Sequence, residues 1–351
     1  MNWPLFCLGI FLFVAIAYDF ALTAISSTGA GPITERWGHC LWRVLLRLGR
    51  HRAKSRVLSQ GGMMILLLTF AHWTFWIWVA NSLVFMAHPL SIVSSQTQEP
   101  GTWADKIYYV GYTLSTLGMG DYVTKDAFWK LYSAFISFLG ITYLTMAITY
   151  LVPVVSAVLG GKCLSIQLSC YGRSPQDILT REWSGTDFGD PPYLGPSTSS
   201  LVIQQGQLHL VYPILNYFHQ RDPRKSIYLN IAKLDEVVTL FEVAVHHDVR
   251  PNDRVLQNMR GALNAYLETL HHGFKEQGHG PLPLPELDSL RRVGIPLEDE
   301  AAIKRGYEKL ANRRCILASM LHHDGWHADA LNLEQDLGEK RDAVPLNPAD
   351  A

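Results

Sequence analysis

The chain has little cysteine and little net charge, and each shortage excludes some kinds of site or partner. Its five cysteines lie far apart and form no CxxC pair, so we expect free thiols, with neither a disulfide framework nor a zinc site. The net charge of -1 gives no reason to expect a nucleic-acid partner. No Lys or Arg precedes Arg36, so the N-terminal apolar run lacks the basic start of a signal peptide, and we interpret it as a retained helix.

Hydrophobic residues make up 48% of the 351 residues and gather in the first 160 of them. Crossing a bilayer takes about 20 apolar residues, and three stretches are long enough: roughly 4–25, 61–87 and 128–159. None of them has an arginine at every third position, which excludes a voltage sensor. The linker 36–56 carries only basic charges, which predicts that it lies on the cytoplasmic side. The segment 88–127 is then at the outer face, and everything after about residue 160 is cytoplasmic.

The linker has its own pattern. Trp37, Leu41 and Leu45 recur at helical spacing, whereas the arginines fall on other faces. Each basic residue near anionic lipid adds about 1 kcal/mol of attraction. We therefore expect an amphipathic helix on the inner leaflet, with a plain topology signal as the compatible alternative. The candidate lipid-binding residues are Arg43, Arg47, Arg50 and Arg52.

The segment after the second span is not an ordinary loop. Residues 103–115 are aromatic and apolar but too short to span the membrane, and Gly118 and Gly120 follow them. Non-helical backbone at membrane depth is tolerated only where it is buried in protein or lines a water-filled path. Successive carbonyls can point at one axis only if alternate residues take unusual dihedrals, which glycine does without steric cost. These residues predict a re-entrant pore helix and a filter of backbone oxygens.

The run Thr116-Leu117-Gly118-Met119-Gly120-Asp121 resembles the filter of the potassium-channel pore-loop family, which reads Thr-Val-Gly-Tyr-Gly-Asp. The likeness extends over residues 61–160. It implies a tetramer in which K⁺ is coordinated by oxygens of Thr116, Leu117, Gly118 and Met119, with Gly120 completing the filter. It also implies that Asp121 braces the filter by a hydrogen bond to a pore-helix aromatic residue, for which Tyr109 is the candidate.

Two positions depart from the family's filter. Leu117 replaces the usual Val, and Met119 replaces the usual Tyr or Phe, although neither change deletes a backbone ligand. Methionine is flexible and fills space without fixing it, so Met119 holds the ring diameter less firmly than an aromatic residue does. A weakly selective monovalent cation channel is therefore an alternative. Tyr112 stands where some members carry Glu, which removes one bracing carboxylate.

The third span should line the inner pore. Gly140 lies in its middle and Pro153 near its cytoplasmic end. A proline inside a helix removes one hydrogen bond and kinks the chain. We expect one or both residues to act as the gating hinge. Close helix packing, which is common for glycine in membranes, is the alternative for Gly140.

The rest of the chain predicts a helical bundle, with helices near 226–247, 254–271 and 297–323. No Gly-rich phosphate loop follows a strand, and no cyclic-nucleotide β-roll is evident. Two His-His-Asp groups, 246–248 and 322–324, suggest a metal or proton sensor. The alternative is that they close helices, where histidine interacts well with the dipole. A membrane-anchored His/Asp metal hydrolase is a further, distinct interpretation.

Taken together, the residues and the resemblance predict an all-α membrane protein of five segments. These are an N-terminal transmembrane helix (1–28), a basic linker (29–60), a pore domain of outer helix, pore helix, filter and inner helix (61–160), a linker (161–200) and a soluble helical cytoplasmic domain (201–351). The predicted function is passive potassium conduction by a homotetramer in a bacterial inner membrane, gated at the inner helix. We expect no enzymatic activity and no cofactor beyond the permeant K⁺.

Overall fold

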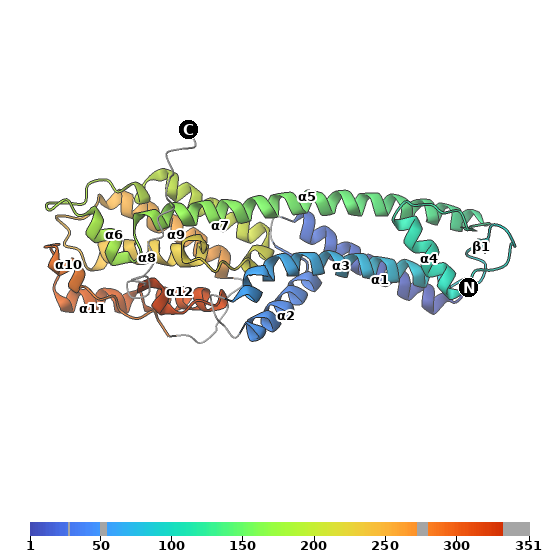
Figure 1. The fold of residues 1–351 in the computed structure, drawn as a ribbon, viewed down its shortest axis with the longest axis horizontal. Helices are drawn as coiled ribbons and strands as arrows, with labels where there is room; N and C mark the ends of the chain where they lie inside the picture. Colours follow the sequence, from blue (N-terminus) through green and yellow to red (C-terminus); the bar gives the residue numbers. More distant parts are fainter. Residues whose placement is uncertain (27–28, 50–54, 272–279, 333–351) are drawn as a thin grey trace, which may run out of the picture. The chain divides into compact units, whose positions relative to one another are not determined.

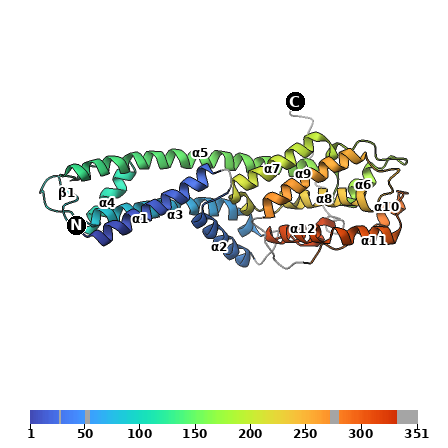
Figure 2. The same cartoon turned by 180° about the vertical axis from the view of Figure 1, so that it is seen from behind.

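The computed structural model describes residues 1–26, 29–49, 55–271 and 280–332, and these are mostly helical (Figures 1 and 2). The chain divides into two compact units. One, here called the membrane unit, comprises Met1–His51, Ser55–Gly160 and Gln207–His219. The other, here called the C-terminal unit, includes Gly161–Gly206 and Gln220–Ala351.

Among the described residues, three helices are long and apolar enough to cross a membrane: α1 (Trp3–Ile25), α3 (Arg56–Met86) and α5 (Ala127–Tyr171). This confirms the predicted all-α membrane fold with three spans. α5 continues well past the predicted end at residue 159. Its 45 residues rise about 67 Å, roughly twice the thickness of a bilayer's hydrocarbon core.

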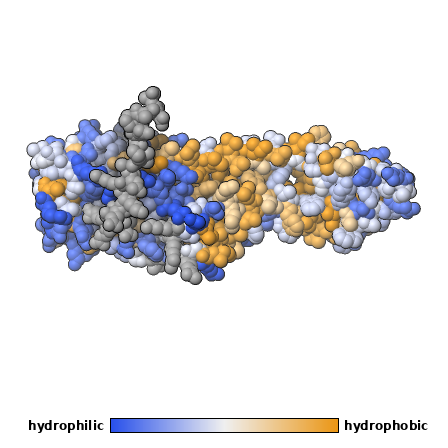
Figure 3. All heavy atoms as spheres, viewed as in Figure 1, coloured by the Kyte–Doolittle hydropathy of each residue, from blue (hydrophilic) through white to orange (hydrophobic). Residues whose placement is uncertain are grey.

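α1 and α3 pack side by side in the membrane unit (Figure 1). Phe20 of α1 meets Trp73 of α3 edge to face, with ring centroids 5.0 Å apart. Gly9 allows the two backbones to approach, because a Cβ there would lie 2.8 Å from the carbonyl oxygen of Ala80. Hydrophobic side chains cover much of the unit's visible surface (Figure 3), as expected of helices that face lipid.

α2 (Pro32–Leu48) begins against a buried carboxylate of α1. Asp19, 1% exposed, accepts hydrogen bonds from the backbone N–H groups of Ile33 (2.8 Å) and Thr34 (3.2 Å). It also accepts from the Thr34 hydroxyl (2.5 Å) and the Trp73 indole N–H (3.3 Å). A carboxylate at a helix N-terminus satisfies unpaired N–H groups and meets the positive end of the dipole. Asp19 therefore ties α1, α2 and α3 together.

The two faces of α2 have different surroundings. Trp42, Leu45 and Leu46 are buried in the membrane unit, whereas Arg43 and Arg47 are exposed. Val44 and Leu48 are exposed as well, so part of the predicted apolar face remains open. The helix starts before the predicted Trp37 and ends before the predicted Arg56. Arg50 and Arg52 lie outside the described residues.

A short segment late in the chain completes the core of the membrane unit. α7 (Pro196–Val211) ends before Pro213, and the 3-10 helix η2 (Pro213–Tyr217) follows. The Tyr217 hydroxyl lies 3.2 Å from Nδ1 of His39 on α2. The buried cluster around η2 comprises Trp42, Leu45, Leu46, Leu58, Ile65, Leu66, Tyr150, Val154, Ala157, Ile214, Leu215 and Tyr217. The segment thus packs with α2, with α3 and with residues 150–157 of α5.

In the C-terminal unit, α8 (Ile227–Val243) is almost wholly buried, because other helices of that unit pack around it. Those helices are α6 (Pro175–Glu182), α9 (Asp253–His271), α11 (Glu300–Lys309) and α12 (Ala311–His323), with the 3-10 turns η3 (Pro223–Lys225) and η4 (Ala328–Asn332). α10 (Asp288–Arg292) packs on α6, and the 3-10 turn η1 (Pro192–Leu194) packs on α9. The predicted helix 297–323 is two helices, with the break at Leu310.

The acidic residues buried on α8 are paired. Asp235 accepts from the Arg260 guanidinium at 3.2 Å and also pairs with Arg313. Glu236 accepts from Arg314 at 2.9 Å, and both side chains are almost fully buried. Paired guanidinium groups prevent the large cost of an isolated buried carboxylate. These charges therefore belong to the core of the unit.

Candidate pore-loop site

Residues 116–121, the predicted filter, are here called the filter segment. The helix before them is α4 (Trp103–Leu114), and it begins at a capping box. The Thr102 hydroxyl accepts from the Asp105 N–H, while the Asp105 carboxylate accepts from the Thr102 N–H at 2.8 Å. Hydrogen bonds from the Thr102 side chain and then from Tyr122 lower the pKa of Asp105. The carboxylate therefore stays ionised at neutral pH and fixes where α4 starts.

α4 is held between α3 and α5. Its Tyr109 packs against Phe85 of α3, with ring centroids 5.1 Å apart, and Trp78 of α3 donates to the Ile107 carbonyl at 2.9 Å. On the other side, Gly140 of α5 lies directly against the carbonyl of Leu114, so that any Cβ there would collide with it. The end of the short helix is thus fixed by backbone contact.

The backbone after α4 alternates in a regular way. Thr116, Gly118 and Gly120 have φ values of 58°, 60° and 79°, whereas the residues between them stay at negative φ. This is the alternation that the sequence led us to expect for carbonyls aimed at one axis. Glycine takes such angles freely, but a β-branched Thr rarely does, so the surroundings must hold Thr116 there.

Tyr112 holds the filter segment at two points. Its carbonyl accepts hydrogen bonds from the N–H groups of Leu117 (2.9 Å) and Gly118 (3.4 Å). Its hydroxyl donates to the Tyr122 carbonyl beyond the filter at 2.9 Å. The sequence analysis noted Tyr112 only because it stands where some channels carry a bracing Glu. Its hydroxyl and its position in the last turn of α4 could have predicted that it contacts the segment that follows.

The partner of Asp121 is not the predicted one. Its carboxylate accepts from the Tyr108 hydroxyl at 3.1 Å, whereas the Tyr109 hydroxyl donates to Ser133 of α5 at 2.7 Å. Consecutive residues on a helix point about 100° apart, so only one of two adjacent tyrosines can face the outer end of the filter. Tyr109 faces the protein interior, and Tyr108 makes the contact with Asp121 that we had expected of Tyr109.

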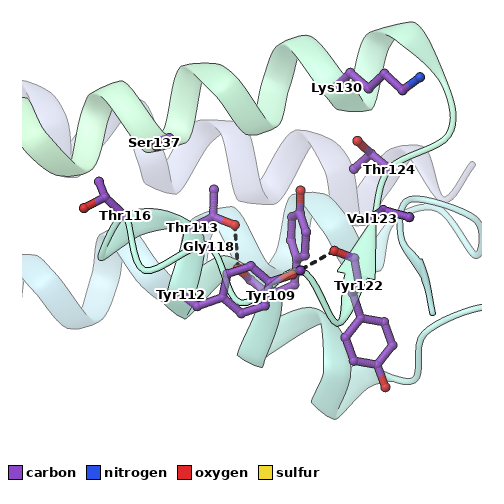
Figure 4. A pocket seen from close by; sticks show the side chains of 11 residues that line it. Tyr109, Tyr112, Thr113, Thr116, Gly118, Tyr122, Val123, Thr124, Lys130 and Ser137 are labelled. Carbon is purple, nitrogen blue, oxygen red and sulfur yellow. Dashed lines mark hydrogen bonds between the residues drawn. The ribbon is translucent and has the colours of Figure 1, made fainter. Parts of the chain in front are cut away.

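A two-residue antiparallel ladder supports the C-terminal end of the filter segment. β1 (Val93–Ser94) pairs with β2 (Tyr122–Val123), and the Ser95 N–H donates to the Asp121 carbonyl at 2.8 Å. Beside the filter lies an open pocket of about 380 Å³, lined from α4, the filter segment, β2 and α5 (Figure 4). Residues 115–121 are exposed in the single chain, including the side chains of Leu117 and Met119.

The two predicted hinge residues lie in different settings on α5. Gly140 contacts the Leu114 carbonyl, which is a close contact of the kind that the alternative interpretation of this glycine expects. Pro153 lies inside the helix, which continues through it. The hinge role of both residues stays a prediction.

The two His-His-Asp groups also differ. His322 and His323 do end α12, as expected. α8, however, ends at Val243, so His246 and His247 lie in the turn after it rather than at a helix terminus. There they contact Asp248 and lie near Glu298.

Comparisons with known proteins agree with this geometry. Residues 62–157 match a family described as "Ion channel". An uncharacterized membrane protein of Bacillus subtilis (strain 168), YdjJ, is 29% identical over 322 residues, which cover 92% of this chain and 94% of the relative. No solved structure matches the chain. The matched range includes most of α3, all of α4, the filter segment and much of α5. The resemblance seen in the sequence is thus confirmed: residues 62–157 are similar to an ion-channel domain, and most of the chain is similar to a membrane protein.

Proposed function

We propose that the chain is one subunit of a homotetrameric, potassium-selective channel that conducts passively. The observation that carries the proposal is the alternating left-handed backbone at Thr116, Gly118 and Gly120, directly after a short pore helix. Four copies around an axis give rings of carbonyl oxygens that replace the hydration shell of K⁺. The coordinating oxygens belong to Thr116, Leu117, Gly118 and Met119, and Gly120 completes the filter.

The exposure of the filter segment supports assembly. Residues 115–121 are not covered by the described part of their own chain, and the pocket beside them is open. Non-helical backbone within a bilayer must be buried in protein or line a water path. Other copies of the chain supply that cover, and the axis between them supplies the water path.

A seam along α5 supports the same arrangement. The seam consists of exposed, uncharged residues at alternating spacings of four and three: Leu131, Phe135, Phe138, Thr142, Thr145, Thr149, Val152, Ser156, Leu159, Cys163, Ile166 and Cys170. A repeat of 3.5 residues is the period at which parallel helices associate around a common axis. The hydroxyl-bearing residues in its middle suit a water-filled cavity, and the apolar residues at its ends suit helix contact.

We assign gating to the part of α5 that follows its contact with α4 at Gly140. Gly140 is pressed against the Leu114 carbonyl, so bending there would displace α4 and the filter. Pro153 lies further along and lacks the backbone N–H that would bond the preceding turn. We therefore place the principal hinge at Pro153. A Pro153→Ala channel should show a changed open probability in single-channel recordings, and an unchanged one would remove this residue from the role.

The charges of the basic linker support one orientation. We assign α2 and the C-terminal unit to the cytoplasmic side of a bacterial inner membrane, because basic segments that flank membrane spans favour that side. Of the four candidate lipid-binding residues, Arg43 and Arg47 are among the described ones; both are exposed, one turn apart on α2, and both can contact anionic lipid.

Met119 is the observation that favours a second candidate, a weakly selective cation channel. Its side chain is 53% exposed in the single chain, so only neighbouring copies can pack it. Reversal potentials of the purified protein in planar bilayers, under opposed K⁺ and Na⁺ gradients, separate the two. A reversal near the K⁺ equilibrium potential supports selectivity, and a reversal near zero supports the second candidate. Met119→Tyr should sharpen selectivity if packing at this position sets the ring diameter.

Two matched glycine variants test the filter itself. Gly118 and Gly185 both have positive φ, and an added Cβ at either would have no atom within 4 Å. Within its own chain, alanine at either site therefore meets only the strain of a positive-φ backbone, about 1 kcal/mol, whereas at Gly118 the same strain distorts the carbonyl positions of the proposed filter. Gly118→Ala should abolish or greatly reduce K⁺ current, while Gly185→Ala in the C-terminal unit should conduct normally. Equal currents from both would refute the assignment of the filter.

A further inference from the structure

The turn after α8 brings four metal-ligating side chains together. A backbone bridge pairs Val245 with Leu297, and two hydrogen bonds flank it. The His246 N–H donates to the Pro296 carbonyl at 2.9 Å, and the Glu298 N–H donates to the Ala244 carbonyl at 2.9 Å. Val245 is also buried. The bridge, its two hydrogen bonds and this burial together fix the main chain of both segments, 244–246 and 296–298. The side chains of His246, His247, Asp248 and Glu298 project from this fixed corner.

Three of these side chains converge. One ligand atom from each of His246, His247 and Glu298 lies within 4.8 Å of the others. Ligands around a bound metal ion at about 2.1 Å lie roughly 3.4 Å apart, so small side-chain rotations would close the site. Such rotations are open to them, because His247 is exposed and the other two are only partly buried.

Asp248 adds an orienting contact to each ring. Its carboxylate lies 3.3 Å from Nδ1 of His246 and 2.8 Å from Nε2 of His247. When the ring nitrogen beside Asp248 carries the proton, each imidazole keeps its second nitrogen for a metal. A carboxylate that accepts from the other nitrogen of a ligating histidine fixes the ring orientation and makes the metal-binding nitrogen more basic.

We propose that His246, His247 and Glu298 bind a divalent transition-metal ion, with Asp248 as the positioning carboxylate. Two imidazole nitrogens and one carboxylate oxygen suit Zn²⁺ and its neighbours, whereas Mg²⁺ and Ca²⁺ prefer sites made of oxygen. The ion joins the end of α8 to the segment that leads into α11. The proposal does not depend on ion conduction, because all of its ligands belong to the C-terminal unit.

The test uses the purified full-length chain in detergent, stripped of metal by a chelator. Zn²⁺ binding is measured by titration calorimetry, and Co²⁺ binding by its visible absorption, which reports nitrogen and oxygen ligands. The variants are His247→Ala and Glu298→Gln. The matched control is His327→Ala, which removes an exposed histidine of the same unit outside the cluster. Melting temperatures of the metal-free variants confirm that each one is folded.

We expect one Zn²⁺ per chain, at least tenfold weaker binding in each cluster variant, and unchanged binding in the control. Excess Mg²⁺ should not displace the ion. Stoichiometric binding that survives both His247→Ala and Glu298→Gln would overturn the proposal. So would the absence of stoichiometric Zn²⁺ binding by the wild-type chain, since the four side chains would then form only an ion-paired surface cluster.

Discussion

The buried carboxylate of Asp19 allows a quantitative test of how the membrane unit holds together. Asp19→Asn keeps the shape of the side chain but removes its charge and turns one acceptor oxygen into a donor. In the structure, Oδ1 receives the Ile33 N–H, and Oδ2 receives groups from Thr34 and Trp73. If Oδ1 becomes nitrogen, the Ile33 N–H loses its acceptor. If Oδ2 becomes nitrogen, the Thr34 and Trp73 N–H groups lose their bonds to Oδ2 and keep only Oδ1 (3.3 Å) and the Thr34 hydroxyl (3.1 Å), respectively.

The expected cost follows from these contacts. A hydrogen bond to a charged group contributes about 1.5–3 kcal/mol. A carboxylate at a partly buried helix N-terminus adds up to about 2 kcal/mol through the dipole. The least disruptive amide orientation loses one such bond and most of the dipole interaction. We therefore expect Asp19→Asn to lower the free energy of unfolding by about 2–4 kcal/mol.

Equilibrium unfolding in mixed detergent, followed by tryptophan emission, measures this change, because Trp73 lies at the contact. Glu35→Gln is the matched control. It removes a carboxylate from the same first turn of α2, but that side chain is exposed, so the change should cost under about 1 kcal/mol. If Asp19→Asn costs no more than Glu35→Gln, the hydrogen bonds to Asp19 do not anchor α2 and the reasoning fails.

Three further predictions concern other parts of the molecule. Burial lowers the pKa of Lys233 from 10.5 to about 8, so between these values the unfolded state binds more protons and stability should rise with pH by up to about 3 kcal/mol. Lys233→Met should flatten that rise in unfolding experiments between pH 7 and 10.5, and an equal slope in both proteins would contradict it. Tyr112→Phe keeps the carbonyl bonds but loses the hydroxyl bond to Tyr122, so channels should inactivate faster in single-channel recordings, and unaltered kinetics would count against bracing at that end. With the other cysteines replaced by Ser, Cys163 alone should form covalent dimers with a short bismaleimide, whereas Cys7 alone, exposed but off the α5 seam, should form far fewer, and equal yields would refute the seam.

The features that the sequence predicted well are those set by local composition. Apolar length alone located the three spans, and the two glycines predicted the backbone alternation of the filter, because glycine's freedom is a property of the residue itself. The length of α5 was underestimated because its continuation past residue 159 mixes polar and apolar residues. Their burial depends on helices of the C-terminal unit that hydropathy does not reveal.

What the sequence could not predict depends on direction and on distant partners. The choice between Tyr108 and Tyr109 for Asp121 rests on which helix face turns toward the filter. The partners of Asp19 are 14 to 54 positions away along the chain. The nearness of Glu298 to the histidine pair depends on a backbone bridge between segments about 50 residues apart. Such pairings follow from tertiary packing rather than from any local pattern.

The return of residues 207–219 has a consequence for how the membrane unit can be isolated. The chain leaves that unit at the end of the Ser55–Gly160 segment and comes back at Gln207 before leaving again after His219. Through η2, the returning segment supplies Ile214, Leu215 and Tyr217 to the buried cluster that also holds Tyr150 and Val154. A fragment that ended at Gly160 would therefore leave part of this cluster uncovered, although it would contain all three long apolar helices up to that residue.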